Sequence, residues 1–355
     1  MYDVITIGSA TRDVFLESPA FKAIRVRKLE HLGFPDGQAE CFPLGSKIEV
    51  SEPTFTVGGG AANAAVTFAR QGLKTASLFK IGKDDESGRA IIADLKKEKI
   101  TSIPIFDRDA ITSYSTILLS PSGERTILNH RGASEDVRIE EVPLNKLIAR
   151  AGYIVPGAIP FPVIMAIVRK LKKGGALLAM DPSKHYLQMG PKRLKPLLDA
   201  LDIIKMNREE AAYLTGVDFK DEVKIFKKLD ELVHSIAIMT DGPKGMLLSD
   251  GKQIYHAGIF EEKEIVDRTG AGDAFGSGLV AALLRSVKIK NQKSKLRNGA
   301  KIMWRESDIR EAIRLGTANA TSVVEYVGAQ PGILTSREFK TQKRWKNLKI
   351  SVKAL

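Results

Sequence analysis

The alternation of short apolar segments with longer amphipathic segments is the feature that most constrains the fold of this chain. YDVITIGS has the β-branched pattern of a strand, and AANAAVTFARQGL has the apolar spacing of a helix. The same order recurs at KTASLFKIG and DESGRAIIADLKKEKI, and then through AGYIVPG, FPVIMAIVRKLKKGG, ALLAMDPS, LDIIKMN, REEAAYLTG, VKIFKKLDELV and SIAIMTDG. This repeated order predicts an α/β protein, a three-layer α/β/α sandwich with a mostly parallel central sheet.

Two segments interrupt the alternation, because they carry short strand patterns with no helix between them. They cover about residues 14–56 and 112–132, and the second one turns at PSGE. We expect both segments to form a small β-strand lid. In open α/β folds ligands bind at the carboxyl ends of the strands, so a lid in that place would cover a bound ligand.

The charge of the chain is compatible with several kinds of partner. Its 355 residues carry a formal net charge of +13, which suits nucleic acid, an acidic membrane surface or an anionic substrate. Most lysines alternate with apolar residues at helical spacing, as in EVKIFKKLDELV, and this favours solvated helix faces. Denser basic segments lie at 288–305 and near the end of the chain. We interpret them as a basic insertion and a surface tail rather than as nucleic-acid sites.

The sequence also predicts a cytoplasmic location. Met1 leads directly into the first strand pattern, without the basic and then long apolar layout of a secretory signal. No apolar run approaches the roughly 18–20 residues of a membrane span, so no membrane partner is expected. Cys41 is the single cysteine, which excludes an internal disulfide.

The segment DRTGAGDAF, at 267–275, combines glycines, a helix start and one carboxylate. A helix N-terminus presents N–H groups and partial positive charge, and small residues at 270–272 would let a phosphoryl group approach them closely. Asp273 would repel a bound phosphate unless it accepts the proton of a hydroxyl that attacks phosphorus. Taken alone, the segment supports equally a general base and a helix N-cap at Asp273.

The segment VGGGAAN, at 57–63, is a second glycine-rich turn before a helix. It is not a P-loop, because no Gly-Lys-Ser/Thr follows, and it lacks the G-x-G-x-x-G spacing of dinucleotide sites. Asn63 is polar on a helix otherwise rich in alanine and valine. We interpret it either as a buried hydrogen-bonding residue or as a contact to a polyol.

GGGAANAAVTFARQG followed by DRTGAGDAFGSGL resembles the paired signatures of the PfkB (ribokinase-like) carbohydrate kinases, and the similarity extends from GSATRD to VGAQPG. The resemblance implies a ribokinase-like sandwich with a lid. It implies a kinase domain over residues 1–340 and a basic C-terminal tail at 341–355. It also implies a phosphotransferase that uses ATP and Mg²⁺ and has an alcohol group as acceptor.

The resemblance assigns roles to matching residues around the transferred group. Asp273 matches the catalytic base, and the anion hole matches Gly270, Ala271 and Gly272. The acceptor would contact Asp13, Gly59, Gly60 and Asn63. The alternative for Asp13 is a solvated acid at the end of a strand.

The resemblance also implies nucleotide and metal contacts. KMNREEA matches an Asn-x-x-Glu pattern associated with Mg²⁺ and phosphate, and magnesium can be held through its waters. For its Glu210 the alternative is a first-turn acid favoured by the helix dipole. The nucleotide contacts are Asn207, Thr240, Gly242, Gly245 and Asn319; the two glycines could instead form ordinary turns, and Asn319 could be an interior helix residue. Asp267, Thr269 and Gly328 resemble the monovalent-cation (K⁺) site of some members.

Two arginines depart from the pattern of the family. Arg268 stands where a small or apolar residue is common, so we expect it to lend positive charge to the transferred phosphate, with solvent exposure as the alternative. Arg131 in NHRGAS would meet a substrate carboxylate or phosphate, or else pair with an acid on the lid. The basic insertion has no counterpart in a minimal member, and we assign it no function.

The sequence therefore predicts a kinase that transfers the γ-phosphoryl group of Mg-ATP to a hydroxyl of a sugar. A ribose, fructose or 2-keto-3-deoxygluconate type of sugar is the leading acceptor class. Nucleosides come next, and a sugar phosphate stays open because of the net charge and Arg131. A non-catalytic polyanion-binding protein on the same scaffold is the alternative from a different class. We also expect that two copies could associate through the lid as a homodimer.

Overall fold

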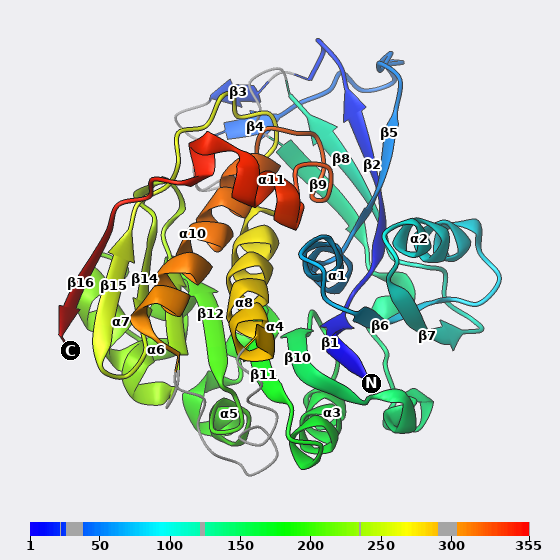
Figure 1. Cartoon of the computed structure of the whole chain (residues 1–355). Helices are drawn as coiled ribbons and strands as arrows, with labels where there is room; N and C mark the ends of the chain where they lie inside the picture. The colour runs from blue at the N-terminus through cyan, green and yellow to red at the C-terminus, as the bar shows by residue number, and fades with distance from the viewer. Residues whose placement is uncertain (22, 26–37, 121–124, 234–235, 290–303, 355) are drawn as a thin grey trace.

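The computed structural model describes residues 1–21, 23–25, 38–120, 125–233, 236–289 and 304–354. Its centre is a ten-stranded sheet in the order β16-β15-β14-β13-β12-β11-β10-β1-β6-β7 (Figure 1). All neighbours from β13 to β7 are parallel, whereas β14, β15 and β16 run antiparallel. The bounds are β1 Tyr2–Gly8, β6 Thr75–Gly82, β7 Thr101–Asp107, β10 Ala149–Val155, β11 Leu177–Met180, β12 Ile203–Asn207, β13 Ile236–Thr240, β14 Met246–Ser249, β15 Gln253–Ala257 and β16 Ile350–Ala354.

Helices cover both faces of this sheet, which confirms the predicted sandwich. Successive residues of a strand point to opposite faces, so Leu178 and Met180 join one core while Leu177 and Ala179 join the other. The first core lies under α3 Phe161–Lys173, α4 Lys184–Leu187, α5 Gly190–Leu198, α6 Arg208–Thr215 and α7 Glu222–Leu232. The other face carries α1 Gly60–Arg70, α2 Glu86–Lys97, α8 Ala271–Ile289, α10 Glu306–Val323 and α11 Ser336–Thr341.

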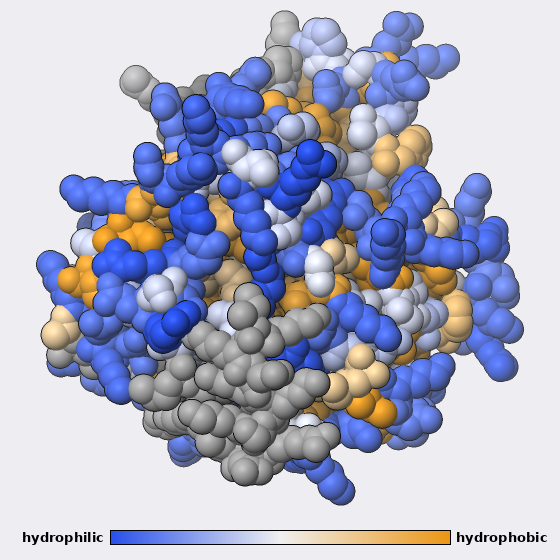
Figure 2. Space-filling view, in the orientation of Figure 1, coloured by the Kyte–Doolittle hydropathy of each residue, from blue (hydrophilic) through white to orange (hydrophobic). Residues whose placement is uncertain are grey.

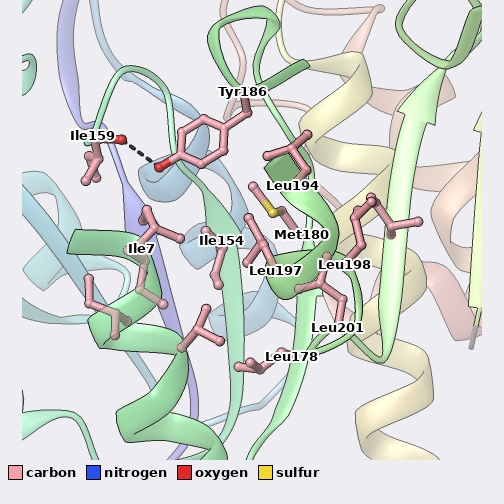
Figure 3. Close-up of a cluster of buried hydrophobic side chains, with 14 of the residues drawn as sticks. Ile7, Ile154, Ile159, Leu178, Met180, Tyr186, Leu194, Leu197, Leu198 and Leu201 are labelled. Atoms are coloured by element: carbon pink, nitrogen blue, oxygen red, sulfur yellow. Dashed lines mark hydrogen bonds between the residues drawn. The ribbon is translucent and has the colours of Figure 1, made fainter. Parts of the chain in front are cut away.

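The core under α3 to α7 is built mainly from aliphatic side chains, together with methionines, Phe226 and Tyr186; Figure 3 shows part of it. Burying one aliphatic side chain of this size contributes about 1.5–3 kcal/mol, so this cluster holds the helices firmly against the sheet. Tyr186 is fully buried, and its hydroxyl donates a hydrogen bond of 2.6 Å to the carbonyl oxygen of Ile159. That bond satisfies the one polar group of the tyrosine inside the core.

The predicted lid is a separate four-stranded sheet in the order β5-β2-β8-β9. Its strands are β2 Thr11–Glu17, β5 Thr54–Gly58, β8 Tyr114–Leu119 and β9 Arg125–His130. Because β1 leads into β2 through two residues only, the lid lies at the carboxyl edge of the parallel strands (Figure 1). β3 Ala23–Arg25 and β4 Gln38–Glu40 form a further two-stranded ribbon. The turn PSGE, at 121–124, lies outside the described residues.

The end of the chain differs from our expectation of a surface tail at 341–355. β16 pairs antiparallel with β15 and extends the central sheet. Trp345 is 1% exposed, and its ring meets that of Phe260 at a centroid distance of 5.3 Å. The apolar residues at 348, 350 and 352 alternate with the polar residues Lys349, Ser351 and Lys353. The apolar ones pack on the core, while the polar side chains face solvent. The basic insertion falls mostly on 290–303, outside the described residues.

Hydrophilic side chains dominate the face of the molecule in Figure 2, with apolar side chains in smaller groups among them. No helix within the described ranges has both the length and the apolar character needed to cross a bilayer.

Candidate active site

The turn before α8 requires glycine at its centre. Gly270 has φ +79, in the left-handed region, and a Cβ there would overlap Ala329. α8 begins at Ala271, so the N–H groups of its first turn have no partner within the helix. Asp273 therefore lies inside the first turn and is not the N-cap, which removes that alternative.

The two glycine-rich segments meet at the start of α8. Asn63 on α1 is 4% exposed, and its Nδ2 donates a hydrogen bond of 2.9 Å to Asp273 Oδ2. Burial raises the pKa of Asp273, while the hydrogen bond from Asn63 and the nearby charge of Lys205 act in the opposite direction. Oδ1 of the same carboxylate would lie 3.3 Å from a Cβ on Gly60. Asp273 is thus a partly buried acid, bound on one side and facing bare backbone on the other.

Of the residues expected to bind the acceptor, Gly60 and Asn63 adjoin this acid, and Asp13 lies against the same glycine turn at Gly58. Asp13 on β2 is 7% exposed, and Thr11 Oγ1 donates a hydrogen bond of 2.8 Å to its Oδ1. Burial raises the pKa of Asp13, and hydrogen bonds from Thr11 and Ser115 partly offset this effect. A Cβ on Gly58 would overlap the Asp13 carboxylate, and Gly59 has φ +88. Asp13 is therefore a buried acid packed against the glycine turn, not a solvated one.

A cavity of about 250 Å³ adjoins the other side of the turn. It brings together residues from two predicted groups that are far apart in the sequence, at 240–245 and 268–272, and most of its walls are apolar. It is lined by Thr240, Gly242, Pro243, Gly245, Met246, Gly258, Ile259, Glu262, Arg268, Ala271, Gly272, Phe275, Thr317, Ala320, Thr321 and Val324. Its position next to helix-start amides suits a flat apolar group that carries phosphates.

Asn319 differs from its expected position at the nucleotide. It is fully buried and does not line the cavity. Its Nδ2 donates to the carbonyl oxygen of Ala274 at 2.8 Å, and its Oδ1 accepts from the N–H of Leu334 at 2.9 Å. The amide thus joins α10 to α8, and the neighbouring Ala320 and Thr321 line the cavity instead.

Asn207 and Glu210 form a capping box at the start of α6. Asn207 Oδ1 accepts from the N–H of Glu210 at 2.8 Å, and Glu210 Oε2 accepts from the N–H of Asn207, also at 2.8 Å. Asn207 pairs in register with Thr240 of the cavity wall. Burial raises the pKa of Glu210. Among the described residues, no three or more His, Cys, Asp or Glu side chains are placed so that they could hold a metal ion.

Asp267 is fully buried at the base of the same turn. Its Oδ1 accepts from the N–H of Thr269 at 2.9 Å, and its Oδ2 accepts from the N–H of Gly328 at 3.0 Å. Arg125 on β9 brings its Nε to 3.9 Å from Asp267 Oδ1. One carboxylate therefore connects the turn, the segment after α10 and the lid.

The two arginines that depart from the family pattern lie in different places. Arg268 is exposed and lines the cavity, so its charge is available to a ligand there. Arg131 is half exposed, and its Nε forms an ion pair of 3.3 Å with Glu135. The alternative for Arg131 is an acid on the lid, whereas its partner Glu135 follows the last lid strand.

Sequence patterns did not single out the polar residues buried under the turn. Lys205 Nζ donates to Asp181 Oδ2 at 2.7 Å, and both residues are less than 10% exposed. Burial raises the pKa of Asp181 to about 7, with Lys205 acting in the opposite direction. The available signal was a lysine inside the apolar strand pattern LDIIKMN, because an unpaired charge is rarely buried.

Solved structures share this architecture. Ribokinase from Giardia lamblia superposes with a TM-score of 0.74 at 19% identity, over 96% of this chain and 99% of that one. Adenosine kinase from Sinorhizobium meliloti gives a TM-score of 0.72 at 21% identity, over 96% of this chain and 98% of that one. At such identities the likeness shows the fold alone, and it confirms the ribokinase-like sandwich with its small second sheet.

Relatives found by sequence comparison have a higher sequence identity to this chain than these two solved structures have. A probable fructokinase-5 of Arabidopsis thaliana is 32% identical over 273 residues, 72% of this chain and 83% of the relative. Fructokinase-2 of Solanum lycopersicum is 30% identical over 318 residues, 84% of this chain and 91% of the relative. The profile described as pfkB family carbohydrate kinase matches residues 35–336. The chain is therefore an ATP-binding phosphotransferase with an alcohol group as acceptor, and it belongs to the pfkB family of carbohydrate kinases.

Proposed function

We propose that this kinase phosphorylates a free ketohexose, with fructose as the first candidate, and that Asp273 is its general base. The observation that carries the proposal is the Asn63 hydrogen bond to Asp273 at the start of α8. It supports a site in which an acid, an acceptor-binding helix and a phosphate-binding turn are adjacent.

Asp273 accepts the proton of the acceptor hydroxyl as its oxygen attacks the γ-phosphorus. The bond between that phosphorus and the β,γ-bridging oxygen breaks, and ADP leaves with the electron pair. The raised pKa of Asp273 fits this role, because a base whose pKa lies nearer the working pH takes a proton more readily. The N–H groups at Gly270, Ala271 and Gly272 stabilise negative charge on the transferred group.

The acceptor is held by Asp13, Gly59, Gly60 and Asn63. A buried carboxylate and a buried amide can bind several adjacent hydroxyls of one sugar, and each such bond to a charged group contributes about 1.5–3 kcal/mol. Asp13 packs against Gly58 and Asp273 against Gly60, so the missing side chain at each glycine lets the carboxylate take its position beside the turn. Fructose is preferred because curated relatives at 30–32% identity are fructokinases.

The nucleotide occupies the cavity beside Gly272, with its base against the apolar walls and its phosphates at the start of α8. Thr240, Gly242 and Gly245 contact it, and the exposed charge of Arg268 lies at the phosphate end. Asn207 and Glu210 would hold Mg²⁺ through water, and the ion would supply neutralisation of phosphate charge. Asn207 is in register with Thr240 and is bonded to the partly buried Glu210, so this one carboxylate near the cavity suits a metal carried in by its nucleotide.

Asp267, Thr269 and Gly328 form the proposed monovalent-cation site. The carboxylate of Asp267 is fully buried, and its ion pair with Arg125 is long, at 3.9 Å, so a cation bound beside it would contribute to balancing the carboxylate. Turnover in KCl is expected to exceed turnover in tetramethylammonium chloride at equal ionic strength. Equal rates in the two salts would remove K⁺ from the proposal.

The lid closes over the acceptor and excludes water, which limits hydrolysis of ATP. We also propose a homodimer through the lid, because β9 is an edge strand whose Ile127 and Leu128 are 46% and 57% exposed. Sedimentation of the full chain tests this, and a monomer at micromolar concentration would refute it. We propose a cytoplasmic location, which cell fractionation would test.

The decisive experiment is ADP release from Mg-ATP with fructose, ribose, 2-keto-3-deoxygluconate, fructose 6-phosphate and adenosine. Fructose is expected to give the highest kcat/KM, and Asp273→Asn should abolish most of the release. A higher kcat/KM with adenosine would assign a nucleoside kinase, and one with fructose 6-phosphate a sugar-phosphate kinase. Salt-sensitive binding of nucleic acid without turnover of any acceptor would favour the polyanion-binding alternative.

A further inference from the structure

A buried lysine lies directly under the anion-hole turn. Lys205 on β12 is 7% exposed, yet a Cβ on Gly272 would come within 3.1 Å of its Nζ. Asp181, which follows β11 and is 8% exposed, accepts a hydrogen bond of 2.7 Å from the same Nζ. The ammonium group therefore reaches the turn from the sheet side, and its direction is fixed by one carboxylate.

Two glycines of α8 leave space for this arrangement. Gly272 and Gly276 are one helical turn apart, so they lie on the same face of the helix. A Cβ on Gly276 would overlap the hydroxyl of Tyr153, a buried group with no hydrogen-bond partner within the described ranges. Larger residues at 272 or 276 would push the helix away from Lys205 and Tyr153. Because α8 has glycine at 272 and 276 on this face, the ammonium group of Lys205 can lie close to the N-terminus of the helix.

A merely structural ion pair does not account for the position of Lys205. Buried ion pairs contribute little net stability, because desolvation of both charges offsets their attraction. The charges of Asp273 and Glu210 also act on Lys205 and, like that of Asp181, raise its pKa, so the one cation lies in an acidic setting. In that acidic setting a polyphosphate would be repelled unless a positive charge stood at the turn that receives it.

We propose that Lys205 is a further catalytic residue, whose ammonium group contacts oxygens of the phosphoryl group in transfer, and that Asp181 is the positioning residue that aims it. The inference rests on the proposed role of the 270–272 turn. Backbone amides approach the phosphoryl group along the helix axis, and Lys205 approaches it from the sheet. The contact strengthens as negative charge concentrates in the transition state, so it acts on kcat more than on binding.

The first test compares Lys205→Met with the wild-type enzyme. Methionine keeps length and apolar volume but removes the charge. We expect kcat with fructose to fall by ~10²–10³-fold, with the KM of fructose within about threefold of wild type, as expected for a contact made only in the transition state. Calorimetry should show similar affinity for ADP alone. Binding of ADP with aluminium fluoride and fructose, which imitates the transition state, should weaken by at least about tenfold.

Lys80→Met is the matched control. Lys80 on β6 is 2% exposed and pairs with Asp107 at 2.8 Å and Glu141 at 3.1 Å, so it is also a buried lysine with two acids. Its loss should lower the melting temperature and leave kcat within about threefold, because it lies outside the proposed site. This control distinguishes the loss of stability that follows removal of a buried lysine from a loss of catalytic activity.

The double variant Lys205→Met/Asp181→Asn tests the positioning role of Asp181. It also serves if the single variant does not fold, because replacing both partners of a buried pair leaves neither charge of the pair without its partner. Asp181→Asn alone should lower kcat by about tenfold, and the double variant should be no slower than Lys205→Met, because Asp181 acts through Lys205. A kcat within about threefold of wild type in the double variant would overturn the inference. If Asp273→Asn were equally unaffected, the proposed function would fail as well; if Asp273→Asn alone were slow, only the inference would fail.

Discussion

Asn63 Nδ2 donates a hydrogen bond of 2.9 Å to Asp273 Oδ2, although 210 residues separate the two in the sequence. Gln330 Nε2 donates to Asn63 Oδ1 at 3.1 Å, so the amide cannot turn over without losing both bonds. One oxygen of Asp273 is thereby held, and the other faces the bare backbone of Gly60. A carboxylate fixed in this way is directed toward a single proton donor, as a general base must be.

Asp273→Asn should lower kcat with fructose by at least ~10²-fold, because an amide cannot accept the proton of the acceptor. ATP affinity, measured by calorimetry, should stay close to that of wild type, since the nucleotide cavity does not include Asp273. Glu306→Gln, at the exposed start of α10, is a suitable control for the loss of one acid. Near-normal turnover of Asp273→Asn would remove this residue from the mechanism.

Asn63→Leu should move the acidic limb of the kcat profile to higher pH. Burial already raises the pKa of Asp273, and the hydrogen bond from Asn63 partly offsets that rise by stabilising the ionised form. Leucine keeps the site buried and removes the bond, so the pKa rises further. The base works only when ionised, so activity must be lost at a higher pH than in wild type. An unmoved acidic limb at saturating fructose would show that Asp273 is not the titrating group.

The fold and part of the site followed from local patterns. Alternating strand and helix segments predict the parallel sheet, and two strand-only segments predict the lid. GGGAAN and DRTGAGD each mark the start of a helix. Their glycines are required only where another group approaches the backbone closely. The structure places α1 and α8 against each other with Asn63 and Asp273 in contact, which neither pattern reveals when taken alone.

Other parts depend on packing that no local pattern specifies. Lys205 and Asp181 meet because β11 and β12 are neighbours in the sheet, a relation between strands 24 residues apart. The resemblance predicts Asn319 at the nucleotide. In the structure its side chain points from α10 toward α8 and donates a hydrogen bond to the carbonyl oxygen of Ala274. Trp345 lies among basic residues, and their charge favours a surface tail. The segment after Trp345 nevertheless has an alternating pattern, and it forms β16 at the edge of the sheet.

Asp13→Ala should mainly weaken binding of the acceptor. The carboxylate is 7% exposed and packs against Gly58, so it can bind sugar hydroxyls away from competing water. Loss of a hydrogen bond to a charged group costs about 1.5–3 kcal/mol, which corresponds to roughly 10- to 150-fold in Kd. Calorimetry with fructose in the presence of ADP measures this loss. Unchanged affinity for fructose would place the sugar elsewhere.

Gly276→Ala should destabilise the protein, although alanine in an ordinary helix interior is favoured over glycine by about 1 kcal/mol. The added Cβ would overlap Tyr153 Oη, and overpacking of this kind costs about 1–3 kcal/mol. Urea unfolding should therefore show a lower free energy of unfolding. Tyr153→Phe in the same chain should restore part of it by removing the hydroxyl. A Gly276→Ala protein more stable than wild type would contradict the packing of α8 on β10.

Trp345→Ala should lower the free energy of unfolding by about 3–5 kcal/mol, as for other large buried aromatic residues. The side chain is 1% exposed, its ring meets Phe260, and its carbonyl oxygen accepts a hydrogen bond of 3.1 Å from Arg314 on α10. Deleting residues 343–355 should cost at least as much, because β15 would also lose its partner strand. Urea unfolding measures both, and Lys349→Ala in the same segment controls for loss of charge. A dispensable surface tail would give wild-type stability in the deletion. That result would exclude β16 from the sheet and restore a domain that ends near residue 340.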